Sequence, residues 1–178
     1  MKKIIFYLYS YFQKKIINQL ELYPPFTISV LNNNISFGPI PRTINDVKYL
    51  SRNNITHIIS LNQTHELEAL PNYLNHLINK NFKRYIFPVL DYSPPSQEQL
   101  TAINNYFQEE LKKNPNVKFY IHCFKGIGRS ATTSLTLQMI QENTEPHNII
   151  FNAKQNFPQI SLNPSQKSAI IEFYLNNI

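Results

Sequence analysis

The sequence predicts a single α/β domain whose central, mostly parallel sheet is flanked by helices on both faces. Three observations support this fold class. Short runs rich in β-branched and aromatic residues alternate with longer segments of helical periodicity, which is the pattern of a parallel sheet covered by helices. The 178 residues suit one compact domain and are few for two. Apolar residues make up 42% of the chain, which is enough to build a core.

The first half of the domain is expected to begin with a β-hairpin. Asn32-Asn33-Asn34 suits a turn with positive φ angles between two β-rich runs. Thr43, with Asp46 three residues later, is typical of a helix start, and a later helix is predicted despite Pro71. The expected elements are strands over 26–31 and 35–37, a helix over 44–52, a strand over 57–61 and a helix over 67–79.

The second half alternates strand and helix more regularly. Ser96 and Gln99 form a capping-box pattern, and Pro146 and Pro164 each suit the first position of a helix. Both strands of this half read as buried, and we expect them to be neighbours in the sheet. The expected elements are strands over 84–90 and 117–121, helices over 96–112 and 130–141, and helices that begin near Pro146 and Pro164.

Residues 1–22 are predicted to form an amphipathic helical extension ahead of a domain over 23–178. The stretch begins like a signal peptide, but no small-residue cleavage site follows and Lys14-Lys15 come soon after, so we expect no export. It is also too short and too interrupted to span a membrane. Two interpretations remain open: the helix docks on the domain, or its basic flanks bind an anionic membrane surface.

The cysteine count and the charge limit the functional classes. A single cysteine excludes an internal disulfide and a Cys-cluster zinc site, and a lone thiol is typical of a reducing compartment, so we expect a cytoplasmic protein. The net charge of +6 suits an anionic partner, either a phosphorylated substrate, an acidic membrane or nucleic acid. No metal-ligand spacing links His57, His65, His76 and His147, so no metal or cofactor is expected.

The segment with the strongest chemical signal joins a predicted buried strand to a predicted helix; it reads His122-Cys123-Phe124-Lys125-Gly126-Ile127-Gly128-Arg129-Ser130. Five residues separate Cys123 from Arg129, so a loop curled around a phosphate can point its backbone N–H groups inward. The helix N-terminus adds a partial positive charge. Gly126 and Gly128 permit positive φ angles and close backbone approach. We therefore predict that residues 124–129 bind phosphate.

The residue types in this loop suggest a separate catalytic role for each side chain. The field of the loop favours the ionised form of Cys123, which is the nucleophile, without a partner base. Arg129 can hold two phosphate oxygens with its planar fork while the transferring group flattens. Ser130 is expected to hydrogen-bond the sulfur and help it leave, and His122 to brace the loop rather than to shuttle protons.

Asp91 is the candidate proton donor for the leaving group. It follows the strand predicted over 84–90, so its loop is expected to open on the same side as the cysteine loop. As a general acid it must be protonated while Cys123 is ionised, which predicts a bell-shaped rate profile on the acidic side of neutral.

Each of these signals has a plainer reading when it is taken alone. A lone cysteine after a strand is usually a small buried hydrophobe, a glycine pair is usually a turn, and an Asp before prolines is usually a turn former. Their combination on one strand–loop–helix unit favours the catalytic reading. Asn163 before Pro164 is most simply a helix cap.

These residues resemble a known family. The pattern His122-Cys123-x-x-Gly126-x-Gly128-Arg129-Ser130 is similar to the signature of cysteine-based protein phosphatases, and the chain after Tyr23 resembles the small, atypical dual-specificity phosphatases. The supporting segments are Gly38-Pro39-Ile40-Pro41-Arg42, Ile58-Ile59-Ser60-Leu61-Asn62, Asp91-Tyr92-Ser93-Pro94-Pro95-Ser96-x-Glu98-Gln99, and Gln166, which falls where the family often has Gln. The resemblance implies a phosphocysteine intermediate, no metal, and phosphotyrosine, phosphoserine or phosphothreonine of proteins as substrates.

Two alternatives stay open. Relatives of this family also dephosphorylate lipids, so the runner-up is a phosphoinositide or phosphatidylglycerophosphate phosphatase. Lipid-acting relatives tend to carry basic residues at the first and fourth positions after the cysteine, where this chain has Phe124 and Ile127. The third hypothesis is a phosphate-binding module without turnover. We expect a phosphorylated protein as the partner, no nucleic acid, and a monomer.

Overall fold

The sheet of the computed structural model has the strand order β1-β2-β5-β3-β4, and the β1–β2 pairing is antiparallel while the others are parallel. The structure describes residues 26–177, so the helix predicted over 1–22 lies outside the described residues. The strands are β1 Ser29–Val30, β2 Ile35–Pro39, β3 His57–Ser60, β4 Lys83–Ile86 and β5 Phe119–Cys123. The predicted mostly parallel α/β sheet is confirmed.

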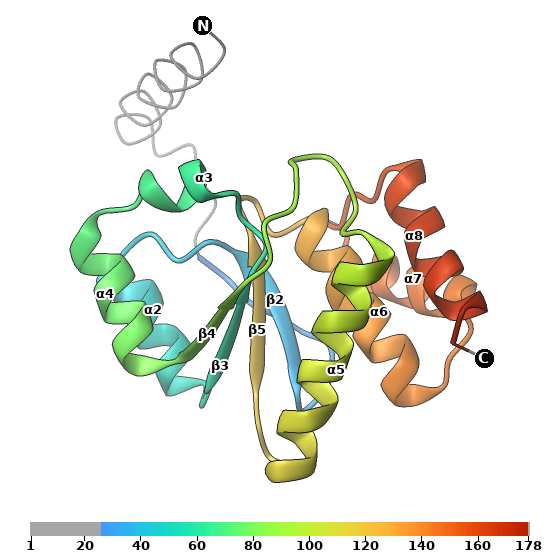
Figure 1. The fold of residues 1–178 in the computed structure, drawn as a ribbon, viewed down its shortest axis with the longest axis horizontal. Coiled ribbons are helices and arrows are strands. Elements are labelled where there is room, and N and C mark those ends of the chain that lie inside the picture. The colour runs from blue at the N-terminus through green and yellow to red at the C-terminus, as the bar shows by residue number, and fades with distance from the viewer. Residues whose placement is uncertain (1–25, 178) are drawn as a thin grey trace, which may run out of the picture.

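Helices cover both faces of the sheet (Figure 1). Helices α2 and α4 lie on one face, and α5 to α8 lie on the other, with α3 above the upper edge. Their bounds are α2 Ile44–Arg52, α3 Thr64–Glu68, α4 Asn72–Asn81, α5 Gln97–Lys113, α6 Arg129–Glu142, α7 Pro146–Asn156 and α8 Pro164–Leu175. In the described part of the chain, no helix has the length and apolarity needed to cross a bilayer.

The alternation of side chains along β5 divides the core into two apolar layers. Phe119 and Ile121 belong to the larger layer, beneath α5 to α8, whereas Tyr120 belongs to the layer beneath α2 and α4. All three side chains are fully buried. Because each such side chain contributes about 1.5–3 kcal/mol on burial, the central strand and the loop that follows it are firmly anchored.

Three predicted helix starts are confirmed in detail. Thr43, Ser96 and Asn163 each cap a helix, and in each case the third helical residue completes a capping box. These boxes satisfy backbone N–H groups that would otherwise have no partner at a helix start. They fix where α2, α5 and α8 begin.

The single helix predicted over 67–79 is wrong, because the chain breaks at Pro71. Helix α3 ends at Glu68 and α4 begins at Asn72. Proline has no N–H to donate and disfavours helical geometry in the residue before it. The break leaves α3 above the upper edge of the sheet, where Glu66 contacts Arg129 at the start of α6.

The strand predicted over 84–90 is also corrected. Strand β4 is short, lies at the edge of the sheet and is largely exposed, and it pairs with β3 rather than with β5. Beyond Ile86 the chain leaves the sheet, although the N–H of Phe87 still donates to the carbonyl of Ser60 at 2.9 Å. The loop that carries Asp91 nevertheless reaches the same edge as the end of β5.

The Asn32-Asn33-Asn34 turn forms without the positive φ angles that its composition suggested. Asn32 instead accepts hydrogen bonds through Oδ1 from the N–H groups of Asn34 and Ile35, both at 3.0 Å. This side-chain turn replaces the left-handed one, and β1 is shorter than the predicted strand over 26–31.

Candidate active site

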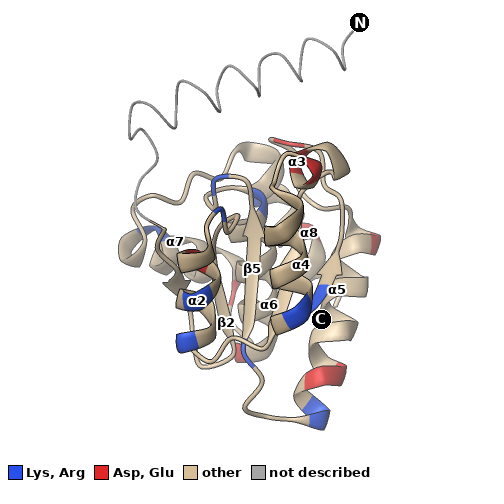
Figure 2. Ribbon diagram, turned by 90° about the vertical axis from the view of Figure 1, so that its left-hand side faces the viewer, with Lys and Arg blue, Asp and Glu red and all other residues tan. Residues whose placement is uncertain are grey.

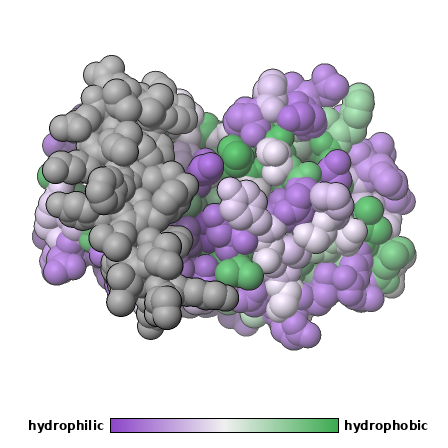
Figure 3. Space-filling model, turned by 90° about the horizontal axis from the view of Figure 1, so that it is seen from above, coloured by the Kyte–Doolittle hydropathy of each residue, from purple (hydrophilic) through white to green (hydrophobic). Residues whose placement is uncertain are grey.

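The candidate site lies at the carboxyl ends of the parallel strands. Strand β5 ends at Cys123 and helix α6 begins at Arg129, so residues 124–128 turn the chain from sheet to helix. Figure 2 shows basic positions in the loops above β5 and acidic positions in α3 at the same edge. Seen from above, hydrophilic and apolar residues are interspersed on the part of this face that the grey atoms leave visible (Figure 3). Ligands of open α/β sheets bind at this edge.

The loop holds Cys123 as a buried thiol, 3% exposed. The Gly126 N–H donates to Sγ at 3.2 Å, and Ser130 Oγ lies 3.3 Å from the same sulfur. Gly126 has a φ of +79°, and a Cβ there would overlap the backbone of Gly38, so both the left-handed angle and the close approach require glycine.

Gly128 departs from the expectation, because its φ of −119° is ordinary. What it provides is space: a Cβ at this position would lie 3.1 Å from Gln166 Nε2. Its role is therefore the close packing of the catalytic loop against α8.

Arg129 is anchored by a carboxylate. Its Nη1 and Nη2 donate to the two oxygens of Glu66, both at 2.8 Å, and Nη1 also donates to the carbonyl of Val89 at 3.0 Å. Burial of the guanidinium opposes its charge, but the hydrogen bonds to Glu66 and the nearby charges of Cys123 and Asp91 raise the pKa of Arg129 above its ordinary value. The fork is held rigidly, as a phosphate clamp requires.

Sequence reasoning missed Glu66. A signal existed, since a buried arginine needs a carboxylate and Glu66 follows a predicted strand that ends at the same edge. The spacing of 63 residues between the partners, however, makes the pairing visible only in the fold.

Asp91 lies at the site as predicted, although its carboxylate contacts the arginine rather than the sulfur. Its Oδ1 is 3.0 Å from Arg129 Nη2, and the side chain is 55% exposed. Its neighbour Tyr92 has a left-handed φ of 64°, which is unusual for a bulky residue. Asn163 Nδ2 donates to the Tyr92 carbonyl at 2.6 Å, so the start of α8 holds this loop in place.

Arg129 also keeps a free position for a ligand atom. Its Nε is buried and has no hydrogen-bond partner among the described residues. A phosphate can therefore accept a hydrogen bond from Nε without displacing any described residue. If it also accepts from Nη2, it competes there with Asp91. A phosphate bound in this way would displace the Asp91 carboxylate from the guanidinium.

His122 lies in the interior of the sheet rather than at the pocket. It is fully buried, and its Nε2 lies 2.6 Å from Ser60 Oγ. Burial, followed by the positive charge of Arg84, lowers the pKa of His122 to about 3. The imidazole is therefore neutral at physiological pH, which suits a bracing group better than a proton shuttle.

Gln166 joins the two loops of the site. Its Oε1 accepts the Asn163 N–H at 3.1 Å, and its Nε2 lies 3.5 Å from the carbonyl of Ser93. The side chain is buried beside Gly128. Gln166 thus couples the Asp91 loop, the catalytic loop and the start of α8.

The pocket above Cys123 has a volume of about 150 Å³. Its lining residues are Asp91, Tyr92, Cys123, Lys125, Ile127, Gly128, Arg129, Ser161, Asn163 and Gln166. Phe124 and Gly126, predicted to bind phosphate, are not among them, and Ser130 lies behind the sulfur. Sequence reasoning did not foresee Tyr92, Ser161 or Asn163 in the lining. Within residues 26–177, no three His, Cys, Asp or Glu side chains gather as a metal site would require.

The strand, loop and helix around Cys123 define a cysteine-based phosphatase domain. The family model described as Swiss Army Knife protein, DSP-PTPase phosphatase domain, matches residues 24–167, and the chain belongs to this family. It is therefore a phosphatase of the dual-specificity type, as the loop signature predicted. No curated protein matches the chain.

Solved structures share the fold at low sequence identity. The active form of Tk-PTP aligns with a TM-score of 0.73 and 20% identity, covering 85% of this chain and 97% of that one. PTPMT1 in complex with PI(5)P aligns with a TM-score of 0.73 and 20% identity, covering 84% and 95%. Kinase associated phosphatase, with its catalytic cysteine substituted by serine, aligns with a TM-score of 0.72 and 20% identity, covering 86% and 96%.

Proposed function

We propose that this chain dephosphorylates protein side chains, phosphotyrosine foremost, through a phosphocysteine intermediate on Cys123. One observation carries the substrate class: the pocket lining offers two cations, Arg129 and Lys125, together with the apolar surfaces of Tyr92 and Ile127. A phosphotyrosine side chain brings one phosphate for the cations and one ring for the apolar surfaces.

In the first step, the Cys123 thiolate attacks the phosphorus atom. The S–P bond forms as the P–O bond to the tyrosine oxygen breaks, and that oxygen takes the proton of the Asp91 carboxyl group. Arg129 holds two of the equatorial oxygens, and the loop N–H groups stabilise the charge that spreads over them.

In the second step, water attacks the phosphocysteine. Asp91, now ionised, takes a proton from the water as the O–P bond forms and the S–P bond breaks, which releases inorganic phosphate. The leaving thiolate is stabilised by hydrogen bonds from the Gly126 N–H and from Ser130, which lie 3.2 and 3.3 Å from the sulfur.

The test compares phosphotyrosine, phosphothreonine and phosphoserine peptides of one sequence with the full chain. We expect the largest kcat/KM for phosphotyrosine and no turnover in Cys123→Ser. Glu98→Gln, which changes an exposed acid on α5, is the control and keeps wild-type rates. Equal turnover of all three peptides would contradict the preference for the ring, and binding without turnover would favour a phosphate-binding module.

The second candidate is a phosphoinositide or phosphatidylglycerophosphate substrate, because PTPMT1, a neighbour in fold, was solved with PI(5)P. The basic residues within 1–22 support it, and the apolar Phe124 and Ile127 count against it. Vesicles that contain PI(5)P, assayed beside the phosphopeptides, decide between the two. A higher kcat/KM on the vesicles would replace the first proposal by the second.

The cellular setting is a proposal of the same kind. The lone cysteine supports action in a reducing, cytoplasmic compartment. We propose a monomer that works on phosphorylated proteins there, with an anionic membrane surface as a further partner for residues 1–22.

A further inference from the structure

Three polar side chains cross the sheet beneath α4, one from each of three neighbouring strands. Arg84 on β4 donates through Nε to Ser60 Oγ on β3 at 3.0 Å, and Ser60 Oγ lies 2.6 Å from His122 Nε2 on β5. Ser60 and His122 are both fully buried. This polar file, Arg84–Ser60–His122, leads from the edge of the sheet to the residue before Cys123.

The pleat places all three side chains on one face. Ile58 pairs with Arg84, and Ser60 pairs with His122. Ile58 and Tyr120, two residues before Ser60 and His122, lie in the apolar layer beneath α2 and α4, and side chains two apart along a strand share a face. The polar file is therefore separated by the sheet from the layer that contains Cys123.

Counting donors fixes the direction of the first hydrogen bond of the file and leaves one proton for the second. Arginine has no acceptor, so Ser60 Oγ accepts from Arg84. The hydroxyl keeps its single proton for another partner, and His122 Nε2, 2.6 Å away, can accept it. In that arrangement the neutral imidazole carries its proton on Nδ1. Its lowered pKa, caused by burial and then by the charge of Arg84, agrees with that neutral form.

The imidazole of His122 lies beside the start of the catalytic loop. His122 Nδ1 lies outside strict hydrogen-bond geometry with every described residue, but the Cys123 backbone is near enough to favour the protonated ring against burial. A proton on Nδ1 would place the positive end of an N–H dipole beside the start of the loop that holds the sulfur.

In the part of the chain that the structure describes, neutral side chains of α4 hold Arg84. Its Nη1 donates to Asn75 Oδ1 at 3.0 Å and contacts Asn79 Oδ1 at 3.4 Å, both on α4, and within residues 26–177 no acidic group lies within ion-pair distance of it. Burying a cation against neutral acceptors is unfavourable for stability. The positive charge of Arg84 acts on His122, where it opposes protonation of the imidazole.

We propose that Arg84 and Ser60 are positioning residues for Cys123. They keep His122 neutral with its proton on Nδ1, and so help to keep Cys123 ionised at the pH of catalysis. This inference rests on the proposed role of Cys123 as the nucleophile. It adds two residues outside the pocket that influence the ionisation of the thiol.

The experiment follows the rate of alkylation of Cys123 by iodoacetamide between pH 4.5 and 9, which needs no substrate and reports a single thiol because the chain has one cysteine. In Ser60→Ala and in Arg84→Gln, we expect the midpoint of the profile to rise by about one pH unit. The rate at pH values below both midpoints then falls about tenfold. Ser60→Thr keeps the hydroxyl and restores the wild-type midpoint.

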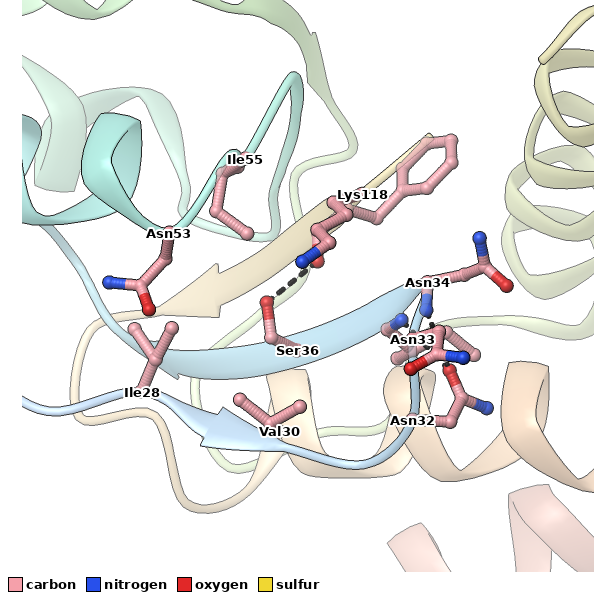
Figure 4. A pocket seen from close by; sticks show the side chains of 11 residues that line it. Ile28, Val30, Asn32, Asn33, Asn34, Ser36, Asn53, Ile55 and Lys118 are labelled. Atoms are coloured by element: carbon pink, nitrogen blue, oxygen red, sulfur yellow. Dashed lines mark hydrogen bonds between the residues drawn. The ribbon is translucent and has the colours of Figure 1, made fainter. Parts of the chain in front are cut away.

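Matched controls separate this effect from a loss of stability. Ser36 is another buried serine, whose Oγ donates to the carbonyl of Phe119 at 2.8 Å in a separate cavity of about 100 Å³ (Figure 4). Ser36→Ala removes a hydroxyl from the same sheet, and Arg52→Gln removes an exposed cation from α2; both are expected to keep the wild-type midpoint. The double variant Ser60→Ala/Arg84→Gln is expected to shift no further than either single variant, because Arg84 acts through Ser60.

The alkylation midpoints distinguish a failure of this inference from a failure of the proposed function. Folded Ser60→Ala and Arg84→Gln proteins with the wild-type midpoint would overturn the inference, and so would an equal shift in Ser36→Ala. A wild-type midpoint near the ordinary value for a free thiol, about 8.5, would instead count against the proposed function, because the nucleophile would not be activated.

Discussion

Replacing Glu66 tests whether the carboxylate that anchors Arg129 is needed for catalysis. Glu66 and Arg129 side chains are 6% and 2% exposed and share two hydrogen bonds of 2.8 Å. Removing one partner of such a buried pair costs about 3–5 kcal/mol, which is the loss we expect in Glu66→Ala. Glu66→Gln keeps one acceptor, and since a hydrogen bond to a charged group is worth ~1.5–3 kcal/mol, we expect it to lose about 2–3 kcal/mol.

The same substitution is expected to lower catalysis. Without the second acceptor the guanidinium can rotate, and a displacement of ~1 Å in a positioning group can lower the rate about 100-fold. The assays are urea unfolding and kcat/KM on a small aryl phosphate at pH 6. Glu68→Gln, an exposed residue of the same helix, is the control. If Glu66→Gln loses no more stability or activity than Glu68→Gln, the carboxylate of Glu66 is not needed to anchor Arg129.

Three further predictions concern the acid, the loop and the pH dependence of stability. Asp91→Asn is expected to lower kcat about 10²–10⁴-fold and to remove the upper limb of its pH profile; retention of the bell shape would exclude Asp91 as the acid. Gly126→Ala is expected to lose phosphate binding, measured by vanadate competition, because the position needs a left-handed φ and has no room beside Gly38; wild-type inhibition would contradict this. Because burial and then Arg84 lower the pKa of His122 to about 3, the unfolded chain takes up a proton that the folded chain does not. The free energy of unfolding should therefore fall as the pH drops from about 6.5 toward 3, by up to ~1.4 kcal/mol per pH unit. His57, whose pKa is lowered chiefly by burial, adds to this slope, and equal urea midpoints at pH 7 and pH 5 would contradict it.

Local features of the fold were predictable because local chemistry decides them. The capping boxes at Thr43, Ser96 and Asn163 each need only residues three apart. The catalytic loop was equally predictable, because its cysteine, glycines and arginine all lie within residues 123–129. The break at Pro71 also follows a local rule, but the apolar periodicity on both sides of the proline suggested one helix.

Long-range features were not predictable from the sequence. The pairing of Glu66 with Arg129 and the place of β4 beside β3 both depend on strand order, which periodicity does not encode. The same holds for the file Arg84–Ser60–His122, whose members come from three strands that are far apart in the sequence. A single polar residue in a predicted strand is not unusual by itself. Only the register of the strands shows that these three side chains are neighbours.

Catalysis by Cys123 is tested most directly by hydrolysis of a small aryl phosphate between pH 5 and 8, with EDTA present and vanadate as the competitor. Cys123→Ser is compared with the wild type. We expect activity that resists EDTA, falls with vanadate, follows a bell-shaped profile below neutral pH and vanishes in Cys123→Ser. Undiminished activity in Cys123→Ser, or none in the wild type, would contradict this expectation.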